Sequence, residues 1–161
     1  MLPYRTGLGY DIHRFAADRP LVLGGVTLPE GPGLAGHSDA DCLTHAASDA
    51  ILGALALPDI GAHFPPDDPT CKDMDSQEIL AFAAGKAAEA GYAIGNLSLM
   101  VLAERPKLRP HIDAMRERLG TTLRLPADRI GIQATTHEGL GSLGRAEGIA
   151  ALAQVLLWRG E

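Results

Sequence analysis

The chain has 161 residues, a length that predicts a single domain over 1–161 with one hydrophobic core. Hydrophobic residues make up 46% and charged residues 21%, which excludes an intrinsically disordered chain. The net charge of −6 opposes broad nucleic-acid binding, which requires a basic surface. Two cysteines are too few for a disulfide scaffold, and no apolar run reaches the roughly 20 residues that span a bilayer. We therefore expect a soluble cytoplasmic protein with no nucleic-acid or membrane partner.

The first forty residues favour strands, and a helix follows them. Residues 4–15 predict a strand that enters a loop, and the apolar, partly β-branched run 21–28 predicts a second strand. Ser38 stands three residues before Asp41, which is the spacing of a capping box. The pattern after it predicts a helix over 40–57.

The middle of the chain alternates between loops, helices and a strand. The proline- and aspartate-rich run 59–69 predicts an irregular loop that handles substrate. A helix is expected over 76–90, a strand over 97–102, and a third helix after Pro110.

The last third of the chain predicts a strand over 130–136 but does not decide between helix and strand for 148–158. The Ala and Leu content of 148–158 favours a helix, whereas its place after a turn allows a strand. Strands and helices therefore alternate along the chain, which indicates a sheet with helices on one or both faces.

Three side chains have the types and spacing of a metal site. Asp11 and His13 are two residues apart, so in a strand they project from the same face, about 6.6 Å apart along the chain. The helix expected over 40–57 carries His45 as a third ligand. One carboxylate and two imidazoles suit zinc and leave a fourth position open to a substrate oxygen. By spacing alone, histidines that merely pack or face solvent remain the commoner explanation.

Two other stretches carry groups that suit anionic oxygens. Thr135 and Thr136 lead into a glycine-rich run that ends at Arg145. Its glycines spell G-x-G-x-x-G, but only 17 residues follow Gly144, so the acidic residue of a dinucleotide fold has no place. A tight turn or a phosphate-contacting loop remains. The cationic run 103–109 is either a clamp on a nucleotide diphosphate or a solvated loop.

Taken together, these motifs resemble the 2-C-methyl-D-erythritol 2,4-cyclodiphosphate synthase family. Ten short matches occur in the family's order and span nearly the whole chain. They are Gly9–His13, Leu23–Val26, His37–Asp41, Leu43–Ala46, Asp59–Gly61, Phe64–Pro65, Asp75–Ser76, Pro106–Lys107, Ala134–Thr136, and Gly144–Arg145 with Glu147–Ile149.

The resemblance implies an α/β fold of the α+β type, with a mixed β-sheet, helices packed on one face, and a strand over 148–158. It implies a homotrimer with active sites at subunit interfaces. It also implies a lyase of the non-mevalonate isoprenoid pathway, which acts on a small-molecule cytidine diphosphate substrate. The reaction converts 4-diphosphocytidyl-2-C-methyl-D-erythritol 2-phosphate to the cyclic diphosphate and releases CMP.

The resemblance further implies two metal sites. Asp11, His13 and His45 match the family's zinc ligands. A second divalent ion, magnesium or manganese, would bridge the substrate phosphates near Glu138.

The remaining roles come from the resemblance as well. His37 and Thr136 match the positions assigned to transition-state stabilisation. The positions that match substrate contacts are Ser38, Asp59, Ile60, Gly61, Phe64, Asp68, Ser76, Ala103, Pro106, Lys107, Leu108, Thr135, Ser142 and Arg145.

The chemistry of this reaction agrees with the residues present. The attacking 2-phosphate has a second pKa of about 6 and is largely ionised at neutral pH, so it needs no strong general base. Its attack on the β-phosphate is limited by closeness and by repulsion between anions, so positioning and charge neutralisation should dominate. Metal ions would supply the positive charge that a chain of net charge −6 lacks.

The sequence departs from the family pattern at two places, so the contacts that the family makes through the missing side chains are not predicted for this chain. No hydroxyl stands between the acids Asp67 and Asp68, and the family's lysine and aromatic are absent at Gly139 and Ser142.

Two other functions also remain: a zinc phosphohydrolase, and a regulatory module that binds a nucleotide or isoprenoid without turnover. The ions used in the cell, prenyl diphosphate binding and association with a cytidylyltransferase are not decided by the sequence.

Overall fold

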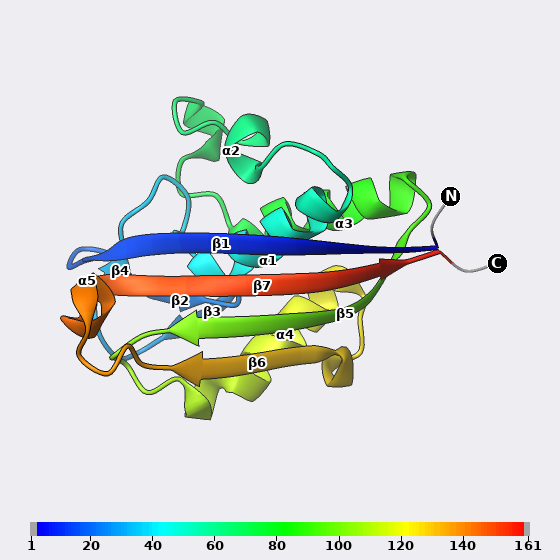
Figure 1. Cartoon of the computed structure of the whole chain (residues 1–161). Coiled ribbons are helices and arrows are strands. Elements are labelled where there is room, and N and C mark those ends of the chain that lie inside the picture. Colours follow the sequence, from blue (N-terminus) through cyan, green and yellow to red (C-terminus); the bar gives the residue numbers. More distant parts are fainter. Residues whose placement is uncertain (1–2, 160–161) are drawn as a thin grey trace.

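The computed structural model describes residues 3–159 and is built on a five-stranded mixed sheet (Figure 1). The strand order is β4-β1-β7-β5-β6. The bounds are Tyr4–Ala16 for β1, Gly33–Leu34 for β4, Ala93–Leu102 for β5, Ile130–Thr135 for β6 and Gly148–Trp158 for β7. The strand that the resemblance predicted over 148–158 is therefore confirmed.

The long strands β1 and β7 form the centre of the sheet. They pair antiparallel from Tyr4 opposite Trp158 to Arg14 opposite Gly148. Strand β7 also pairs antiparallel with β5, and β5 runs parallel to β6. Because parallel neighbours need a crossover, the chain passes through a helix between β5 and β6.

Three longer helices lie behind the sheet in Figure 1, so the expected mixed α/β fold with helices is confirmed. They are α1 (Cys42–Ala54), α3 (Ser76–Glu89) and α4 (Ile112–Leu123). The short helical turns are α2 (Ile60–His63), α5 (Gly141–Gly144), η1 (Pro69–Cys71), η2 (Arg109–His111) and η3 (Ala127–Arg129). Among residues 3–159, no helix is long and apolar enough to cross a membrane.

Glycines in β1 let helix α1 approach the sheet closely. A Cβ atom on Gly9 would lie 1.9 Å from the carbonyl oxygen of Ala46, and one on Gly7 would lie 1.9 Å from that of Ala50. Backbone atoms cannot move aside as the end of a flexible side chain can, so only glycine fits at these two positions. This close approach brings the side chains of α1 within reach of those of β1.

The single strand expected over 21–28 is wrong. The segment forms a hairpin of β2 (Leu21–Leu23) and β3 (Val26–Leu28). Gly24 and Gly25 make the turn, with φ angles of +56° and +72° that side-chain-bearing residues rarely adopt. The Gly24–Gly25 pair between two short apolar runs is itself a hairpin signal, which the prediction of a single strand did not use.

The capping box expected at Ser38 and Asp41 is also wrong, because Asp41 is itself the N-cap of α1. Its carboxylate accepts hydrogen bonds from Thr44 N at 3.0 Å, Gly24 N at 2.9 Å and Gly25 N at 2.7 Å. Helix α1 ends at Ala54 rather than at residue 57. Asp41 thus joins the hairpin turn to the helix, a contact that short-range spacing cannot show.

The run 59–69 is more ordered than the expected irregular loop. It contains α2 and the start of η1, and each has an aspartate as its N-cap residue. Asp59 accepts a hydrogen bond from Ala62 N at 3.2 Å, and Asp68 accepts one from Thr70 N at 2.9 Å. These aspartates cap short helical turns, as Asx residues commonly do.

The face of the sheet turned away from the helices carries exposed apolar side chains. Leu8, Tyr10 and Ile12 alternate along β1 with residues that face α1, and their exposed fractions are 71%, 55% and 46%. Tyr4 and Trp158 extend this exposed set at the end where β1 meets β7. Such an apolar face is typical of a surface that is covered by another protein copy or a ligand.

Candidate functional site

The three sequence-predicted metal ligands meet between β1 and α1. Asp11 Oδ2 lies 2.8 Å from His13 Nε2 and 3.0 Å from His45 Nδ1. The two imidazole nitrogens are 3.4 Å apart. Asp11 and His13 project from β1 towards α1, and the Gly9–Ala46 contact places His45 opposite them.

This donor set fits a zinc ion. Ligands bound at about 2.1 Å around a tetrahedral ion lie about 3.4 Å from one another, close to the distances that separate these three atoms. His13 Nδ1 lies 2.6 Å from the carbonyl oxygen of Ala35, which can only accept, so Nδ1 carries the ring hydrogen. Nε2 of His13 is therefore the nitrogen that faces Asp11 and the cluster, and its lone pair becomes available to a metal ion when its proton leaves.

Charge within the cluster shifts two pKa values. Burial alone would raise the pKa of Asp11 and lower that of His13, because it disfavours both charged forms. The hydrogen bonds and opposite charges outweigh burial, so the pKa of Asp11 is lowered below its ordinary 3.8 and that of His13 is raised above its ordinary 6.5. A metal ion that binds here must displace the proton of His13.

The cluster opens into a cavity of about 230 Å³, which we call the metal cavity. Predicted residues from three other segments join the cluster in its wall: His37 and Ser38 before α1, and Ile60, Gly61 and Phe64 in and after α2. Sequence reasoning missed Pro66, Cys71, Met74 and Ile79, which complete the wall. These four carry no charge or metal-ligand pattern that would have singled them out.

Among the substrate contacts predicted between residues 38 and 76, three lie outside the lining of the metal cavity. The carboxylates of Asp59 and Asp68 cap α2 and η1 as described above. Ser76 is fully buried at the start of α3, and its hydroxyl contacts His45 Nε2 at 2.8 Å and Asp39 Oδ1. The hydroxyl of Ser38, in contrast, lies 3.2 Å from His45 Nε2 within the wall of the cavity.

A second cavity of about 450 Å³, the loop cavity, lies where β5 and β6 end. The backbone joins its two walls, since Ala103 N donates to the carbonyl oxygen of Thr135 at 3.0 Å. The predicted residues that line it are Ala103, Pro106, Lys107, Leu108, Thr135 and Thr136. Glu104 and Arg109 of the cationic run 103–109 also line it, and the missed residues are Pro110 and Ala134.

The glycine-rich segment holds the last three predicted residues. Glu138 is exposed, has a positive φ of 51°, and lies 3.4 Å from the hydroxyl of Thr136. Arg145 pairs with Glu147 at 2.6 Å on the surface. Ser142 lines a third cavity of about 300 Å³, which shares His13 with the metal cavity.

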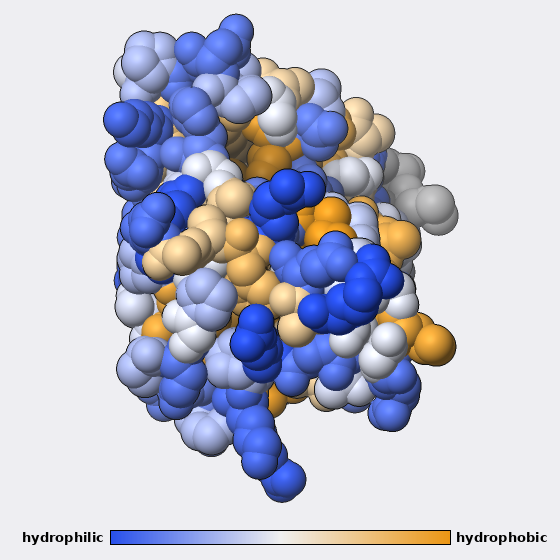
Figure 2. Space-filling view, turned by 90° about the vertical axis from the view of Figure 1, so that its left-hand side faces the viewer, coloured by the Kyte–Doolittle hydropathy of each residue, from blue (hydrophilic) through white to orange (hydrophobic). Residues whose placement is uncertain are grey.

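The metal cavity and the loop cavity lie at the same end of the sheet but next to different strands. Asp11 and His13 are in the last half of β1, and the loop cavity follows the ends of β5 and β6. Figure 2 views this end directly, where hydrophilic residues dominate and apolar ones show between them. Strands β7 and β5 separate β1 from β6, a distance of about 14 Å at normal strand spacing.

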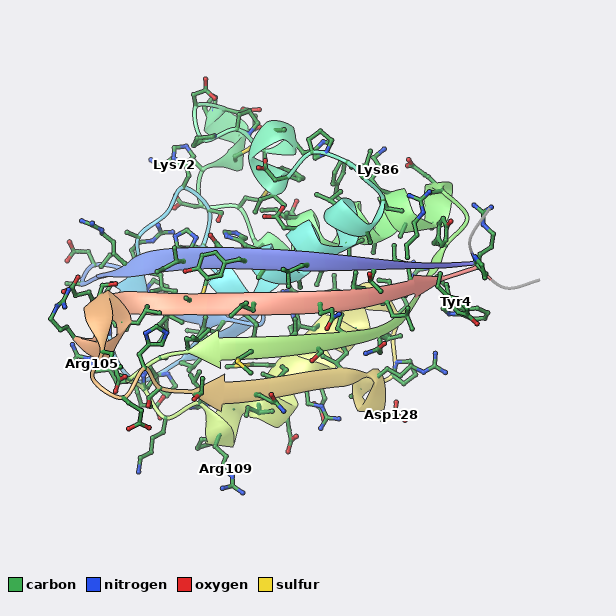
Figure 3. All side chains as sticks on the ribbon, in the orientation of Figure 1. Tyr4, Lys72, Lys86, Arg105, Arg109 and Asp128 are labelled. Atoms are coloured by element: carbon green, nitrogen blue, oxygen red, sulfur yellow. The ribbon has the colours of Figure 1, made fainter. Side chains whose placement is uncertain are left out.

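The two cavities have separate surroundings. In Figure 3, Lys72, next to Cys71 of the metal cavity, lies above the sheet, and Arg109 of the loop cavity lies below it. The two cavities share no lining residue. His37 and Thr136, which the resemblance assigns to one chemical step, therefore lie in separate cavities of the chain.

Comparisons with known proteins agree with this geometry. The family model described as the YgbB family matches residues 4–158. A 2-C-methyl-D-erythritol 2,4-cyclodiphosphate synthase from Thermosynechococcus vestitus is 56% identical over 160 residues, which is 99% of each chain.

Solved structures share the fold. The bifunctional IspDF from Campylobacter jejuni matches with a TM-score of 0.94 and 42% identity over 98% of this chain, which spans 43% of that longer protein. The CDP complex of IspF from Plasmodium falciparum matches with a TM-score of 0.87 and 32% identity, over 98% of this chain and 97% of that one. The chain therefore belongs to the YgbB family of 2-C-methyl-D-erythritol 2,4-cyclodiphosphate synthases.

Proposed function

We propose that the metal cavity and the loop cavity together carry out the reaction of this family. The chain is a lyase that converts 4-diphosphocytidyl-2-C-methyl-D-erythritol 2-phosphate to the 2,4-cyclodiphosphate and releases CMP. The observation that carries the proposal is the convergence of Asp11, His13 and His45 in one cavity. We further propose that the chain works as one domain in the cytoplasm.

Asp11, His13 and His45 would hold zinc, and Glu138 would take part in binding a second ion, magnesium or manganese. When bound, these ions neutralise charge on the phosphates and so lower the repulsion between the two reacting anions. The donor types support this assignment, because imidazole with carboxylate suits zinc, whereas a lone carboxylate with water suits magnesium.

The residues of the chain position the substrate around these ions. Ser38, Ile60, Gly61 and Phe64 line the space beside the cluster and would hold the erythritol phosphate end. His37, also in this wall, would hold the 2-phosphate in line with the β-phosphate, which is the positioning that intramolecular attack requires.

The loop cavity would bind the cytidine diphosphate end. Lys107 and Arg109 supply positive charge in a lining that also carries Glu104, and Thr135 and Thr136 offer hydroxyl groups. The CDP bound by the similar Plasmodium falciparum protein supports a cytidine nucleotide as ligand. Arg145 and Ser142 would contact the phosphates from the glycine-rich segment.

The separation of His37 from Thr136 supports an active site made by two copies of the chain. A homotrimer would place the metal cavity of one subunit against the loop cavity of the next. The exposed apolar residues of β1 supply a surface that such an assembly would cover.

Product analysis tests the reaction. The chain is incubated with the cytidine diphosphate substrate and magnesium, and the products are followed by phosphorus NMR. We expect a cyclic diphosphate and CMP in equal amounts. Free phosphate or CDP would instead support a zinc phosphohydrolase, and binding without turnover would support a regulatory module.

Subunit mixing tests the shared active site. His45→Ala changes the metal cavity and Thr136→Ala changes the loop cavity, so each variant alone should be nearly inactive. After unfolding and joint refolding, mixed trimers contain some interfaces with both cavities intact, and activity should return. No recovery in mixed trimers that mass spectrometry detects would show that both cavities must belong to one chain.

A further inference from the structure

A hydrogen-bond chain leads from His45 away from the substrate side of the cluster. His45 Nδ1 faces Asp11 Oδ2 at 3.0 Å, and its Nε2 faces the hydroxyl oxygen of Ser76 at 2.8 Å. That hydroxyl in turn contacts Asp39 Oδ1, and the backbone N–H of Ser76 donates to Asp39 Oδ2 at 3.0 Å. Ser76 is fully buried, so solvent does not compete for these contacts.

The donors and acceptors in this chain determine where each hydrogen lies. A carboxylate only accepts, so the one hydroxyl hydrogen of Ser76 goes to Asp39. Towards His45, the Ser76 oxygen can then only accept, so Nε2 of His45 carries the ring hydrogen. Nδ1 faces the carboxylate of Asp11 at 3.0 Å. A metal ion that binds at Nδ1 takes the place of any hydrogen shared with Asp11, while Nε2 keeps its own hydrogen towards Ser76.

Ser38 contacts the same nitrogen but has a different role. Its oxygen accepts from Ala40 N at 3.2 Å and lies 3.2 Å from His45 Nε2, so both neighbours are donors. Within residues 3–159, no acceptor is found for the Ser38 hydroxyl hydrogen, and Ser38 lines the metal cavity. That hydrogen remains available to a phosphate oxygen of the substrate.

We propose that Asp39 and Ser76 are positioning residues that hold His45 in the tautomer that binds metal through Nδ1. Ser76 then acts through His45 and does not contact the substrate, unlike the role implied by the family resemblance. The inference rests on the proposed zinc site and extends it to residues behind the ligands. Such partners commonly change metal affinity 10- to 100-fold when they are removed.

Asp39 is suited to this task because both of its oxygens are engaged. Oδ2 accepts from Ser76 N, and Oδ1 accepts from the Ser76 hydroxyl and from Asp41 N at 3.1 Å. In Asp39→Asn, a single acceptor oxygen would face these three donors. The Ser76 hydroxyl would then be free to donate to His45 and to favour the opposite tautomer.

Cobalt binding tests the proposal without measuring turnover. Metal-stripped full-length protein is titrated with Co²⁺, and binding is followed by the visible absorption of the bound ion. We expect Ser76→Ala and Asp39→Asn to weaken Co²⁺ binding about 10- to 100-fold. Ser38→Ala is the matched control: it should leave Co²⁺ binding close to that of the unchanged protein while it raises KM for the substrate.

Equal Co²⁺ affinity in Ser76→Ala and in the unchanged protein would overturn the proposal, as would an equal loss in Ser38→Ala. If the unchanged protein bound no Co²⁺, the proposed metal function itself would fail, which is a separate result. Circular dichroism checks that each variant is folded.

Nitrogen NMR of the zinc-loaded, unchanged protein gives an answer that does not depend on any variant. The two-bond proton–nitrogen correlations should show His45 with its hydrogen on Nε2 and with zinc on Nδ1. A hydrogen on Nδ1 would contradict the proposed hydrogen-bond chain directly. In Ser76→Ala, we expect the Nε2 hydrogen to exchange with solvent faster, because its acceptor is lost.

Discussion

The metal cavity and the loop cavity are built in different ways. In the metal cavity, the ligands are half-buried or buried, and each ring nitrogen that faces away from the cluster is held by another group. In the loop cavity, Thr135, Thr136 and Lys107 are exposed. The first site is thus organised before any ligand binds, whereas the second offers a surface that a ligand or a second subunit must complete.

This difference separates the effects that mutations should have. A change in the metal cavity should remove the proposed ion and the chemistry that depends on it. A change in the loop cavity weakens substrate binding and leaves the ion in place.

The largest effect is expected from Asp11→Asn. The amide keeps the shape of the side chain but removes the negative charge that the ion and both histidines face. We expect zinc affinity and kcat/KM to fall by more than about 100-fold, since a direct ligand matters more than its supporting partners. Elemental analysis and steady-state kinetics measure the two losses. Full activity in a variant that holds no zinc would contradict the claim that the chemistry depends on an ion in the metal cavity.

A large effect on stability is expected from Gly9→Ala. The added methyl group would meet the carbonyl oxygen of Ala46, so α1 must shift away from β1 and carry His45 with it. We expect a loss of about 3 kcal/mol in the free energy of unfolding, measured in urea, together with weaker metal binding.

Gly85→Ala is the control for that experiment. Gly85 is in the interior of α3, and a Cβ atom there would meet nothing within 4 Å. Alanine is the better helix former, so this variant should gain about 0.5–1 kcal/mol. A similar loss in both variants would show that the Gly9 contact is not special.

A smaller and more selective effect is expected from Lys107→Ala. The variant removes the ammonium group from the loop cavity, so KM for the cytidine substrate should rise about tenfold, equivalent to about 1.4 kcal/mol. Zinc content should stay unchanged. Arg105→Ala removes the same charge from the same loop outside the cavity lining and should leave KM nearly unaltered. Equal loss of zinc and of substrate affinity in Lys107→Ala would contradict the separation of the two cavities.

The smallest effect is expected from a change in pH. The raised pKa of His13 means that protonated His13 stabilises the metal-free fold at low pH, and that this stabilisation is lost as the pH rises through the raised value. A metal ion competes with that proton, so zinc affinity should increase as the pH rises through the raised pKa of His13. Calorimetric titration with zinc measures this trend.

The pattern of the sequence was sufficient to predict most elements and the shared direction of Asp11 and His13. Asp11 and His13 alternate in a strand, so their shared direction follows from the two-residue period of the backbone. The helices over 42–54, 76–89 and 112–123 follow from local periodicity, which each segment carries by itself.

Long-range contacts decided what the pattern could not. The hairpin turn at Gly24 and Gly25 is joined to the N-cap at Asp41 by hydrogen bonds across 16 and 17 residues. Whether a serine near His45 faces the substrate or the interior depends on where α3 packs, so the buried position of Ser76 was not visible in its own neighbourhood. Motif and period are local properties of the chain, whereas burial and hydrogen-bond partners arise only when distant segments meet.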